Sequence, residues 1–302
     1  MDRSLAQLAW HNGRMRHVLV LSLVGLVGCG SGPGDGPGDD AGGGGGDGGA
    51  PVDGATVGSD AAPARDGGAV SPDGGPGPGP TRSCPFTKDS LGFFDLQSPM
   101  SSYTVHLPAN YDVQNPTPRG LLVALHGCGD MARNFAQWGA VAGSFRASHD
   151  YIAISLGGRE GACWTVPGDG ALVMAAIDHV RSCFWVHQKK IAIAGYSSGG
   201  ILAYDFGLKH AAMFAGILIE NSGLPGGNVD ALLAGAAWKL HIGHTARLSD
   251  GSFPIAGVQA GRDKLLAAGF PLEYRELPGS HDGTSDDWSM FLLPKLAGWM
   301  AP

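Results

Sequence analysis

A serine between glycines is the residue whose surroundings most clearly suggest chemistry. Ser197 lies in the pentapeptide Gly-Tyr-Ser-Ser-Gly, residues 195–199, between a short apolar run (191–194) and a helix-compatible stretch (201–208). A serine on a tight turn between a strand and a helix has an exposed Oγ. The flanking glycines are needed there because a Cβ would collide with the neighbouring backbone. Ser197 is therefore our candidate nucleophile, and the alternative is an ordinary Gly-Ser turn.

Such a serine needs a base that takes its proton and an acid that orients the base. On this kind of turn the chain order is serine, then Asp or Glu, then His. Among the histidines after Ser197, His281 lies in a polar loop beyond the last expected strand, where a base would enter the site. Asp250 is the expected acid by elimination. The alternatives are a solvated loop histidine for His281 and a local Asp-Gly turn for Asp250.

Backbone N–H groups must stabilise the oxyanion of an attacked carbonyl group. Ser198 follows the nucleophile and would donate one N–H. Cys128 would donate the second, since it lies between glycines directly after an expected strand. Trp138, Trp164 and Trp288 fall in or beside loops expected at the carboxyl edge of the sheet, where they would bind substrate. The alternative for each is packing in the core or at its rim.

Strands and helices alternate in the segment that must position these residues. Apolar runs predict strands at 103–107, 121–126, 151–156, 191–194, 214–220, 238–243 and 272–277. Helices are expected at 132–148, 170–184, 200–209, 255–268 and 286–300. This alternation is typical of an α/β fold with a mostly parallel central sheet flanked by helices. Residues 82–302, about 220 in number, are enough for a single domain with a sizeable core.

The N-terminal region has two segments that we expect to lie outside this domain. Arginines precede the apolar run 18–27, which is too short to span a bilayer and indicates a signal peptide over 1–28. The run ends in Leu-Val-Gly-Cys, which resembles a bacterial lipobox, so we expect lipidation at Cys29 and a membrane anchor there. A plain secretory signal with an incidental cysteine is the alternative. Either Met1 or Met15 is the start.

The second segment, 29–81, consists of the lipidated cysteine and a tether rich in glycine, aspartate and proline. Residues 30–80 contain 20 glycines, eight Asp and one Arg. This segment therefore accounts for the whole net charge of the chain, which is −7. Such a composition predicts a disordered spacer. The remaining chain is neutral, which excludes a basic nucleic-acid surface. We expect an ester substrate, a monomer, and no cofactor, metal or nucleic acid.

Four cysteines follow Cys29, and an even number in an exported domain predicts two disulfides. We favour Cys128 with Cys163, since both should lie in loops at the carboxyl edge of the sheet, and Cys84 with Cys183. Free buried thiols are the alternative.

Four stretches together resemble the polyhydroxybutyrate depolymerase and feruloyl esterase group of α/β-hydrolases, over residues 82–302. They are Leu-His-Gly-Cys-Gly (125–129), Cys-Trp (163–164), Cys183 and Gly-Tyr-Ser-Ser-Gly-Gly (195–200). The resemblance implies an α/β-hydrolase fold and a secreted carboxylesterase without cofactor. It also implies a triad of Ser197, Asp250 and His281 and a bond between Cys128 and Cys163. In the family the acid closely follows His-Gly-Thr, whereas Gly-His-Thr-Ala-Arg (243–247) is followed by an acid only at Asp250.

The expected substrate is a polyester or a feruloylated polysaccharide, and the sequence is compatible with either. A function of a different class is also open, namely a non-catalytic surface lipoprotein that binds a polymer or small ligand with a hydrolase-like fold.

Overall fold

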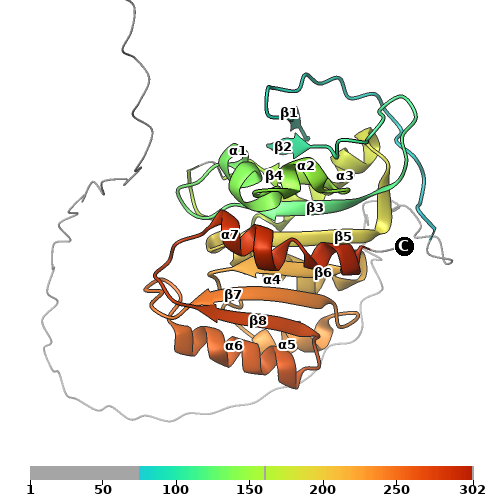
Figure 1. Cartoon of the computed structure of the whole chain (residues 1–302). Coiled ribbons are helices and arrows are strands. Elements are labelled where there is room, and N and C mark those ends of the chain that lie inside the picture. The colour runs from blue at the N-terminus through green and yellow to red at the C-terminus, as the bar shows by residue number, and fades with distance from the viewer. Residues whose placement is uncertain (1–74, 160, 301–302) are drawn as a thin grey trace, which may run out of the picture. The chain divides into compact units, whose positions relative to one another are not determined.

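An eight-stranded sheet is the central feature of the computed structural model, which describes residues 75–159 and 161–300 (Figure 1). The strand order is β1-β2-β4-β3-β5-β6-β7-β8. The pairs β1–β2 and β2–β4 are antiparallel, and all other pairs are parallel. The strands are β1 (Phe93–Gln97), β2 (Ser102–His106), β3 (Arg119–Leu125), β4 (Ile152–Leu156), β5 (Val186–Tyr196), β6 (Gly216–Glu220), β7 (His241–Arg247) and β8 (Leu272–Leu277).

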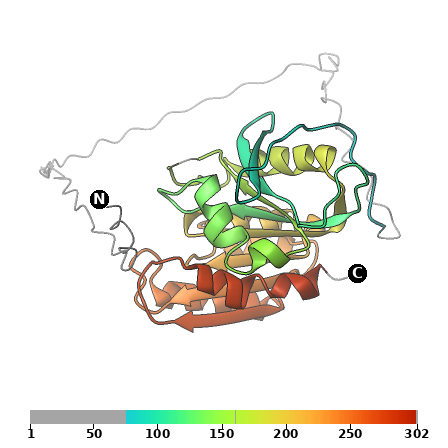
Figure 2. The same ribbon diagram turned by 45° about the horizontal axis from the view of Figure 1, so that its top comes forward.

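Helices cover both faces of this sheet, which is why its central strands are apolar on both sides. The first face packs against α3 (Gly170–Cys183), α4 (Ser198–Lys209), α5 (Val229–Gly235) and α6 (Ile255–Ala267). The second packs against α1 (Ala132–Phe135), η1 (Ala136–Ala140), α2 (Phe145–Ser148), η3 (Trp288–Leu292) and α8 (Lys295–Trp299). Figure 2 shows α1 and α2 beside the red C-terminal helices. The expected class, a mostly parallel sheet flanked by helices, is confirmed.

Several expected elements differ from those in the structure. The helix expected over 132–148 is divided into α1, η1 and α2, and the one expected over 286–300 is divided into α7 (Ser285–Asp287), η3 and α8. Pro294 precedes α8, where its missing N–H costs no helical hydrogen bond. Strand β1, helix α5 and the short helix η2 (Ala211–Met213) were not expected. The side chain of Asn228 caps α5 by accepting from the Ala231 amide, a local signal that the sequence does carry.

Strand β7 is displaced from its expected position. It begins at His241 and ends at Arg247, whereas the sequence predicted 238–243. Trp238 lies outside the ladder because its indole Nε1 donates to the carbonyl of Ala211. The strand therefore continues four residues beyond the expected end, and the loop that follows it begins later.

The N-terminal boundary of the domain is earlier than expected. Residues 75–81 were assigned to a tether, yet Trp185 Nε1 donates to Gly77 O at 3.2 Å and the Thr81 amide donates to Ser182 O at 3.0 Å. The expected signal peptide, Cys29 and the expected tether up to residue 74 lie outside the described residues. Among the helices that the structure describes, none is both long and apolar enough to cross a bilayer.

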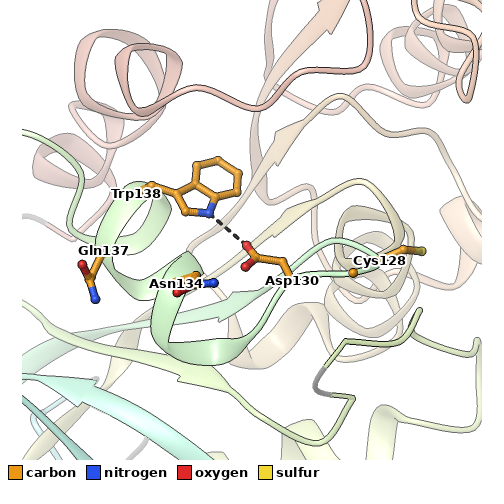
Figure 3. A pocket seen from close by; sticks show the side chains of 6 residues that line it. Cys128, Asp130, Asn134, Gln137 and Trp138 are labelled. Carbon is orange, nitrogen blue, oxygen red and sulfur yellow. Dashed lines mark hydrogen bonds between the residues drawn. The ribbon is translucent and has the colours of Figure 1, made fainter. Parts of the chain in front are cut away.

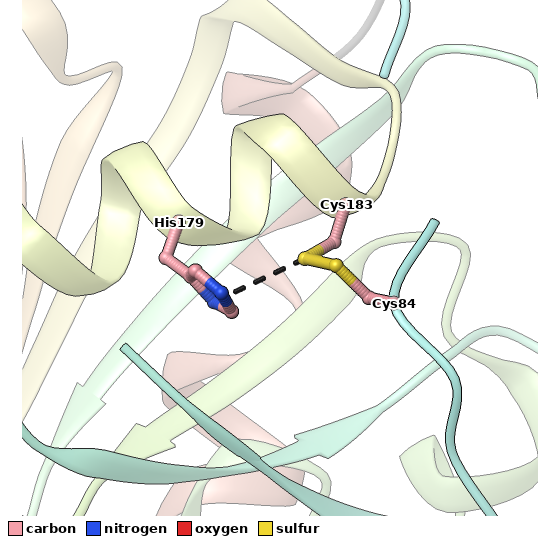
Figure 4. A group of neighbouring side chains, drawn as sticks. All are labelled: Cys84, His179 and Cys183. Atoms are coloured by element: carbon pink, nitrogen blue, oxygen red, sulfur yellow. Dashed lines mark hydrogen bonds between the residues drawn. A yellow bond between two sulfur atoms is a disulfide. The ribbon is translucent and has the colours of Figure 1, made fainter. Parts of the chain in front are cut away.

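Two disulfides connect distant parts of the described chain, Cys84–Cys183 and Cys128–Cys163. The first ties the segment before β1 to the end of α3 (Figure 4). The second joins the loops that follow β3 and β4. Both therefore constrain loops that the sheet alone does not fix.

Candidate active site

Ser197 lies on a sharp turn between β5 and α4, with φ 53° and ψ −121°. A non-glycine residue with positive φ is strained, and such strain persists only where the surrounding structure enforces it. The neighbours enforce it here by close packing. A Cβ on Gly195 would lie 2.3 Å from the carbonyl carbon of Gly199, and one on Gly199 would lie 2.2 Å from Leu125 O. The turn therefore requires both glycines and presents the serine side chain at the carboxyl edge of the sheet.

The structure brings Ser197, His281 and Asp250 into one hydrogen-bonded chain. Ser197 Oγ lies 2.8 Å from His281 Nε2, and His281 Nδ1 lies 2.7 Å from Asp250 Oδ2. The Asp250 side chain is 1% exposed and that of His281 is 25% exposed. A carboxylate can only accept, so the imidazole donates through Nδ1 and offers Nε2 to the serine hydroxyl. This is the arrangement in which an imidazole can remove the serine proton.

Asp250 follows β7 by three residues, and the displaced strand explains its position. The segment Gly243 to Arg247 has no acid of its own. It forms the last five residues of β7 and carries the buried His244 and Thr245. Asp250 then begins a turn in which its Oδ1 accepts from the amides of Ser252 and Phe253, at 2.8 and 2.9 Å. Because β7 ends at Arg247 and not at residue 243, the acid lies shortly after the end of its strand.

The loop that carries His281 is held by polar side chains from two strand ends. Tyr196 Oη donates to the carbonyl of His281 at 2.7 Å, and Asn221 Nδ2 donates to the carbonyl of Asp282 at 2.9 Å. The rings of Tyr196 and Phe253 lie near-parallel to the imidazole, with centroids at 5.4 and 5.5 Å. These contacts fix both the backbone and the ring of His281.

Of the two expected oxyanion donors, Ser198 directly follows the serine, and Cys128 follows Gly127, which lies close to the serine. Ser198 is the first residue of α4, and the first amides of a helix have no intrahelical acceptor. The loop with Cys128 approaches from β3. A Cβ on Gly127 would lie 3.3 Å from the Cβ of Ser197, so glycine allows this close approach. The Cys128–Cys163 bond ties the same loop to the loop after β4.

The three tryptophans expected to bind substrate have different surroundings. Trp138 is half-buried and lines a cavity of about 470 Å³ with Cys128, Gly129, Asp130, Asn134 and Gln137. Its Nε1 donates to Asp130 Oδ2 at 2.9 Å (Figure 3). Trp164 and Trp288 are 6% and 0% exposed, and their indole N–H groups donate to His126 O and to Glu220. The expectation that these two bind substrate was wrong, because the protein itself covers their rings.

A second, more apolar cavity of about 340 Å³ lies beyond Phe253, between the loop after β6 and α6. Leu224, Pro225, Val229, Pro254 and Val258 are among its lining residues. The cavity at Trp138 is lined by residues that follow β3, whereas this cavity is lined by residues that follow β6 and β7. In the strand order, β3 and β6 are the two neighbours of β5. Ser197, at the end of β5, therefore lies between the two.

The other histidines after Ser197 have different partners. His244 is fully buried, its Nδ1 lies 3.0 Å from Tyr204 Oη, and burial lowers its pKa to about 3, so it is neutral. His241 stacks on Trp299, and His210 ends α4 beside Phe206. None of them contacts the serine.

One group in the described part of the chain has the side chains of a metal site, namely Cys84, His179 and Cys183 (Figure 4). The two sulfurs are bonded to each other, and His179 Nδ1 lies 2.6 Å from Tyr103 Oη. A metal would need the free thiolates. The group is therefore a disulfide with a hydrogen-bonded histidine beside it.

Sequence reasoning missed three residues that shape the site. Glu220, the last residue of β6, is fully buried and accepts from the Thr284 amide and from Trp288 Nε1. Asn221 has a positive φ of 46°, and Phe253 packs on the imidazole. A charged residue that ends an otherwise apolar strand was the available signal for Glu220.

The strand order and the serine turn define the α/β-hydrolase fold. Among solved structures the chain is similar to a ferulic acid esterase, with 18% identity, coverage of 69% of this chain and 96% of that one, and a TM-score of 0.53. It is also similar to the S-formylglutathione hydrolase FrmB from Staphylococcus aureus, with 15% identity, coverage of 72% of this chain and 98% of that one, and a TM-score of 0.57. A third similar structure is FphF, a fluorophosphonate-binding serine hydrolase from Staphylococcus aureus. Its identity is 16%, the match covers 75% of this chain and 100% of that one, and the TM-score is 0.55.

These similarities establish the fold. No family model matches the sequence, and no curated protein matches it.

Proposed function

We propose that this protein is a serine carboxylesterase with Ser197 as nucleophile, His281 as general base and Asp250 as the acid that orients the base. The observation that carries the proposal is the continuous contact from Ser197 Oγ through the imidazole to Asp250. The likeness to esterase structures supports the same reaction class.

The reaction follows from the geometry. Ser197 Oγ attacks the ester carbonyl carbon while its proton passes to His281 Nε2, and the amides of Cys128 and Ser198 stabilise the negative oxygen. His281 then gives the proton to the alcohol oxygen as the bond to the acyl carbon breaks. Water attacks the acyl-enzyme by the same route, and the acid leaves as Ser197 regains its proton.

For the substrate we propose an ester that joins a hydroxyl-bearing part to a more apolar part. The cavity at Trp138 has amide and carboxylate side chains beside an indole, which suits a sugar, and the cavity beyond Phe253 suits an aromatic or aliphatic group. This favours a feruloylated polysaccharide over a polyhydroxyalkanoate, whose two sides are alike.

We further propose that the protein is exported and anchored through Cys29. The two disulfides support export, since such bonds are typical of oxidising compartments. The alternative, a non-catalytic binding protein, rested on the irregular spacing of the acid. With Asp250 Oδ2 at 2.7 Å from the imidazole, no observation favours it.

The first test is turnover of p-nitrophenyl acetate, methyl ferulate and polyhydroxybutyrate by the purified protein and its Ser197→Ala variant. We expect the variant to lose about 10⁴-fold or more in kcat, because the nucleophile is removed. We also expect methyl ferulate to exceed polyhydroxybutyrate in kcat/KM. Equal turnover by the parent protein and the variant would refute the role of Ser197, and the reverse preference would refute the substrate assignment.

A further inference from the structure

Glu220 contacts the turn that carries Ser197 and the end of the loop that carries His281. Its backbone carbonyl accepts from the Ser197 amide at 3.1 Å. Its carboxyl group accepts from the Thr284 amide at 2.9 Å and from Trp288 Nε1 at 2.5 Å, at the end of the loop that carries His281. The side chain is fully buried, so the packing around it leaves little room for other positions. One residue thus connects the nucleophile's turn with the loop of the base.

The start of the His281 loop is held by Arg247, which also connects it to Asp287 and Glu220. Arg247, the last residue of β7, donates to the carbonyl of Pro278 at 3.2 Å and pairs with Asp287. The carboxyl groups of Asp287 and Glu220 interact in turn, since burial raises the pKa of Glu220 and the charge of Asp287 helps to raise it. The chain Arg247–Asp287–Glu220 therefore clamps residues 278–284 at their start and at their end.

A hydrogen bond between two carboxyl groups requires a proton on one of them. Asp287 forms an ion pair with the Arg247 guanidinium. Burial raises the pKa of Glu220 well above its usual range, and the charge of Asp287 adds to this effect. A proton shared by the two groups would therefore be carried by Glu220, whose neutral carboxyl group can donate to Asp287. Tyr196 also interacts with this carboxyl group, and its pKa is raised to about 12, first by burial and next by the charge of Glu220.

We propose that Glu220 is a positioning residue that keeps the His281 imidazole at hydrogen-bond distance from Ser197 Oγ. The proposal rests on the function proposed above. It assigns Glu220 no contact with substrate. Its effect passes through Thr284 and Asp287 to the loop, and a displacement of about 1 Å at the reacting atoms can cost about 10² in rate.

The test compares Glu220→Ala and Glu220→Gln with the parent protein, using p-nitrophenyl acetate. Glu220→Ala should lower kcat about 100-fold with KM within about threefold, because the base is displaced while the substrate surface remains. Glu220→Gln should stay within about tenfold of the parent protein. Its amide accepts from the Thr284 amide and donates to Asp287, although it places a second donor opposite Trp288. Glu273→Ala, at an exposed glutamate of β8, is the matched control.

The pH profile distinguishes positioning from simple packing. In the parent protein kcat should fall on the alkaline side, because ionised Glu220 repels Asp287 and releases the loop. The neutral form is the competent one, so activity is present below the raised pKa of Glu220 and is lost as the pH rises through it. Glu220→Gln cannot ionise and should lack this fall. A fall that persists unchanged in Glu220→Gln would overturn the proposal.

A measurement independent of turnover separates this proposal from the proposed function. The proton NMR signal of the His281 Nδ1–H bonded to Asp250 should be present in the parent protein and Glu220→Gln, and lost in Glu220→Ala. A parent protein that hydrolyses no ester yet shows this pattern would refute the esterase and keep the positioning role. An unchanged signal and kcat in folded Glu220→Ala would refute the positioning role alone. If Glu220→Ala does not fold, the pH profile of Glu220→Gln decides.

Discussion

Asp250 uses its two oxygens for different purposes. Oδ2 lies 2.7 Å from His281 Nδ1, and Oδ1 accepts from the amides of Ser252 and Phe253. The two interpretations of this residue, a local turn and the acid of a triad, are therefore compatible. The turn holds the carboxylate so that one oxygen faces the imidazole.

We predict that Asp250→Asn lowers kcat about 10⁴-fold, as expected when the acid of a triad is replaced by an amide. The asparagine oxygen can still accept from the amides of Ser252 and Phe253, so the NH₂ group of its side chain faces His281 Nδ1. The ring must then accept at Nδ1 and carry its hydrogen on Nε2, where it cannot take the serine proton. Steady-state kinetics together with the melting temperature would check this.

Asp263→Asn, an exposed residue on α6, is the control for the loss of one carboxylate. A drop of less than tenfold in a stably folded Asp250→Asn protein would contradict the role of Asp250 as the orienting acid.

Single residues were predictable where local chain geometry decides their place. The turn at Ser197 follows from glycines that no other residue can replace. The sequence left open whether Trp164 and Trp288 bind substrate or pack in the core, because their burial depends on contacts with His126 and Glu220 from distant strands. The catalytic roles of the triad residues remain predictions.

The β5–turn–α4 unit depends on the contact between Gly199 and the end of β3. An added Cβ would lie 2.2 Å from Leu125 O and 2.5 Å from His126 O, and both atoms belong to the backbone. Neither can move without shifting the loop that carries Cys128.

We predict that Gly199→Ala lowers the free energy of unfolding by about 3 kcal/mol, since overpacking against fixed atoms is destabilising. Urea unfolding would measure it. Gly257→Ala, in α6 where an added Cβ meets open space, should instead add about 0.5–1 kcal/mol through helix propensity. Similar effects of the two substitutions would contradict the steric explanation.

The order of the elements was predictable from alternating apolar runs, whereas their ends often were not. Strand 272–277 was predicted with its observed bounds. Strand β7 was predicted to begin too early because tryptophan is common in strands. In the structure Trp238 lies outside the ladder, and its indole N–H donates to the carbonyl of Ala211. Strand β1, with its mixed burial, is defined by its antiparallel pairing with β2 at the sheet edge, which its own sequence does not signal.

The two disulfides constrain the whole domain, but only one of them lies at the candidate site. Cys84–Cys183 closes a separation of 99 residues and Cys128–Cys163 one of 35. By loop entropy each contributes about 4 kcal/mol to stability.

We predict that changing both Cys84 and Cys183 to Ser costs about 4 kcal/mol and alters kcat less than threefold. Changing both Cys128 and Cys163 should cost a similar free energy and also lower kcat about tenfold, because the oxyanion loop loses its covalent tie. Urea unfolding and p-nitrophenyl acetate turnover separate the two effects. Equal kcat in both double variants would contradict the role of the second bond.

The Cys128–Cys163 bond also links the timing of activity to the place of synthesis. In a reducing cytoplasm the two thiols would stay apart, and the loop with Cys128 would be free to move away from Ser197. By the prediction above, a newly made chain of the proposed esterase would then have about tenfold lower kcat than the oxidised protein. If the protein is exported as proposed, oxidation of the two thiols after export would raise its activity.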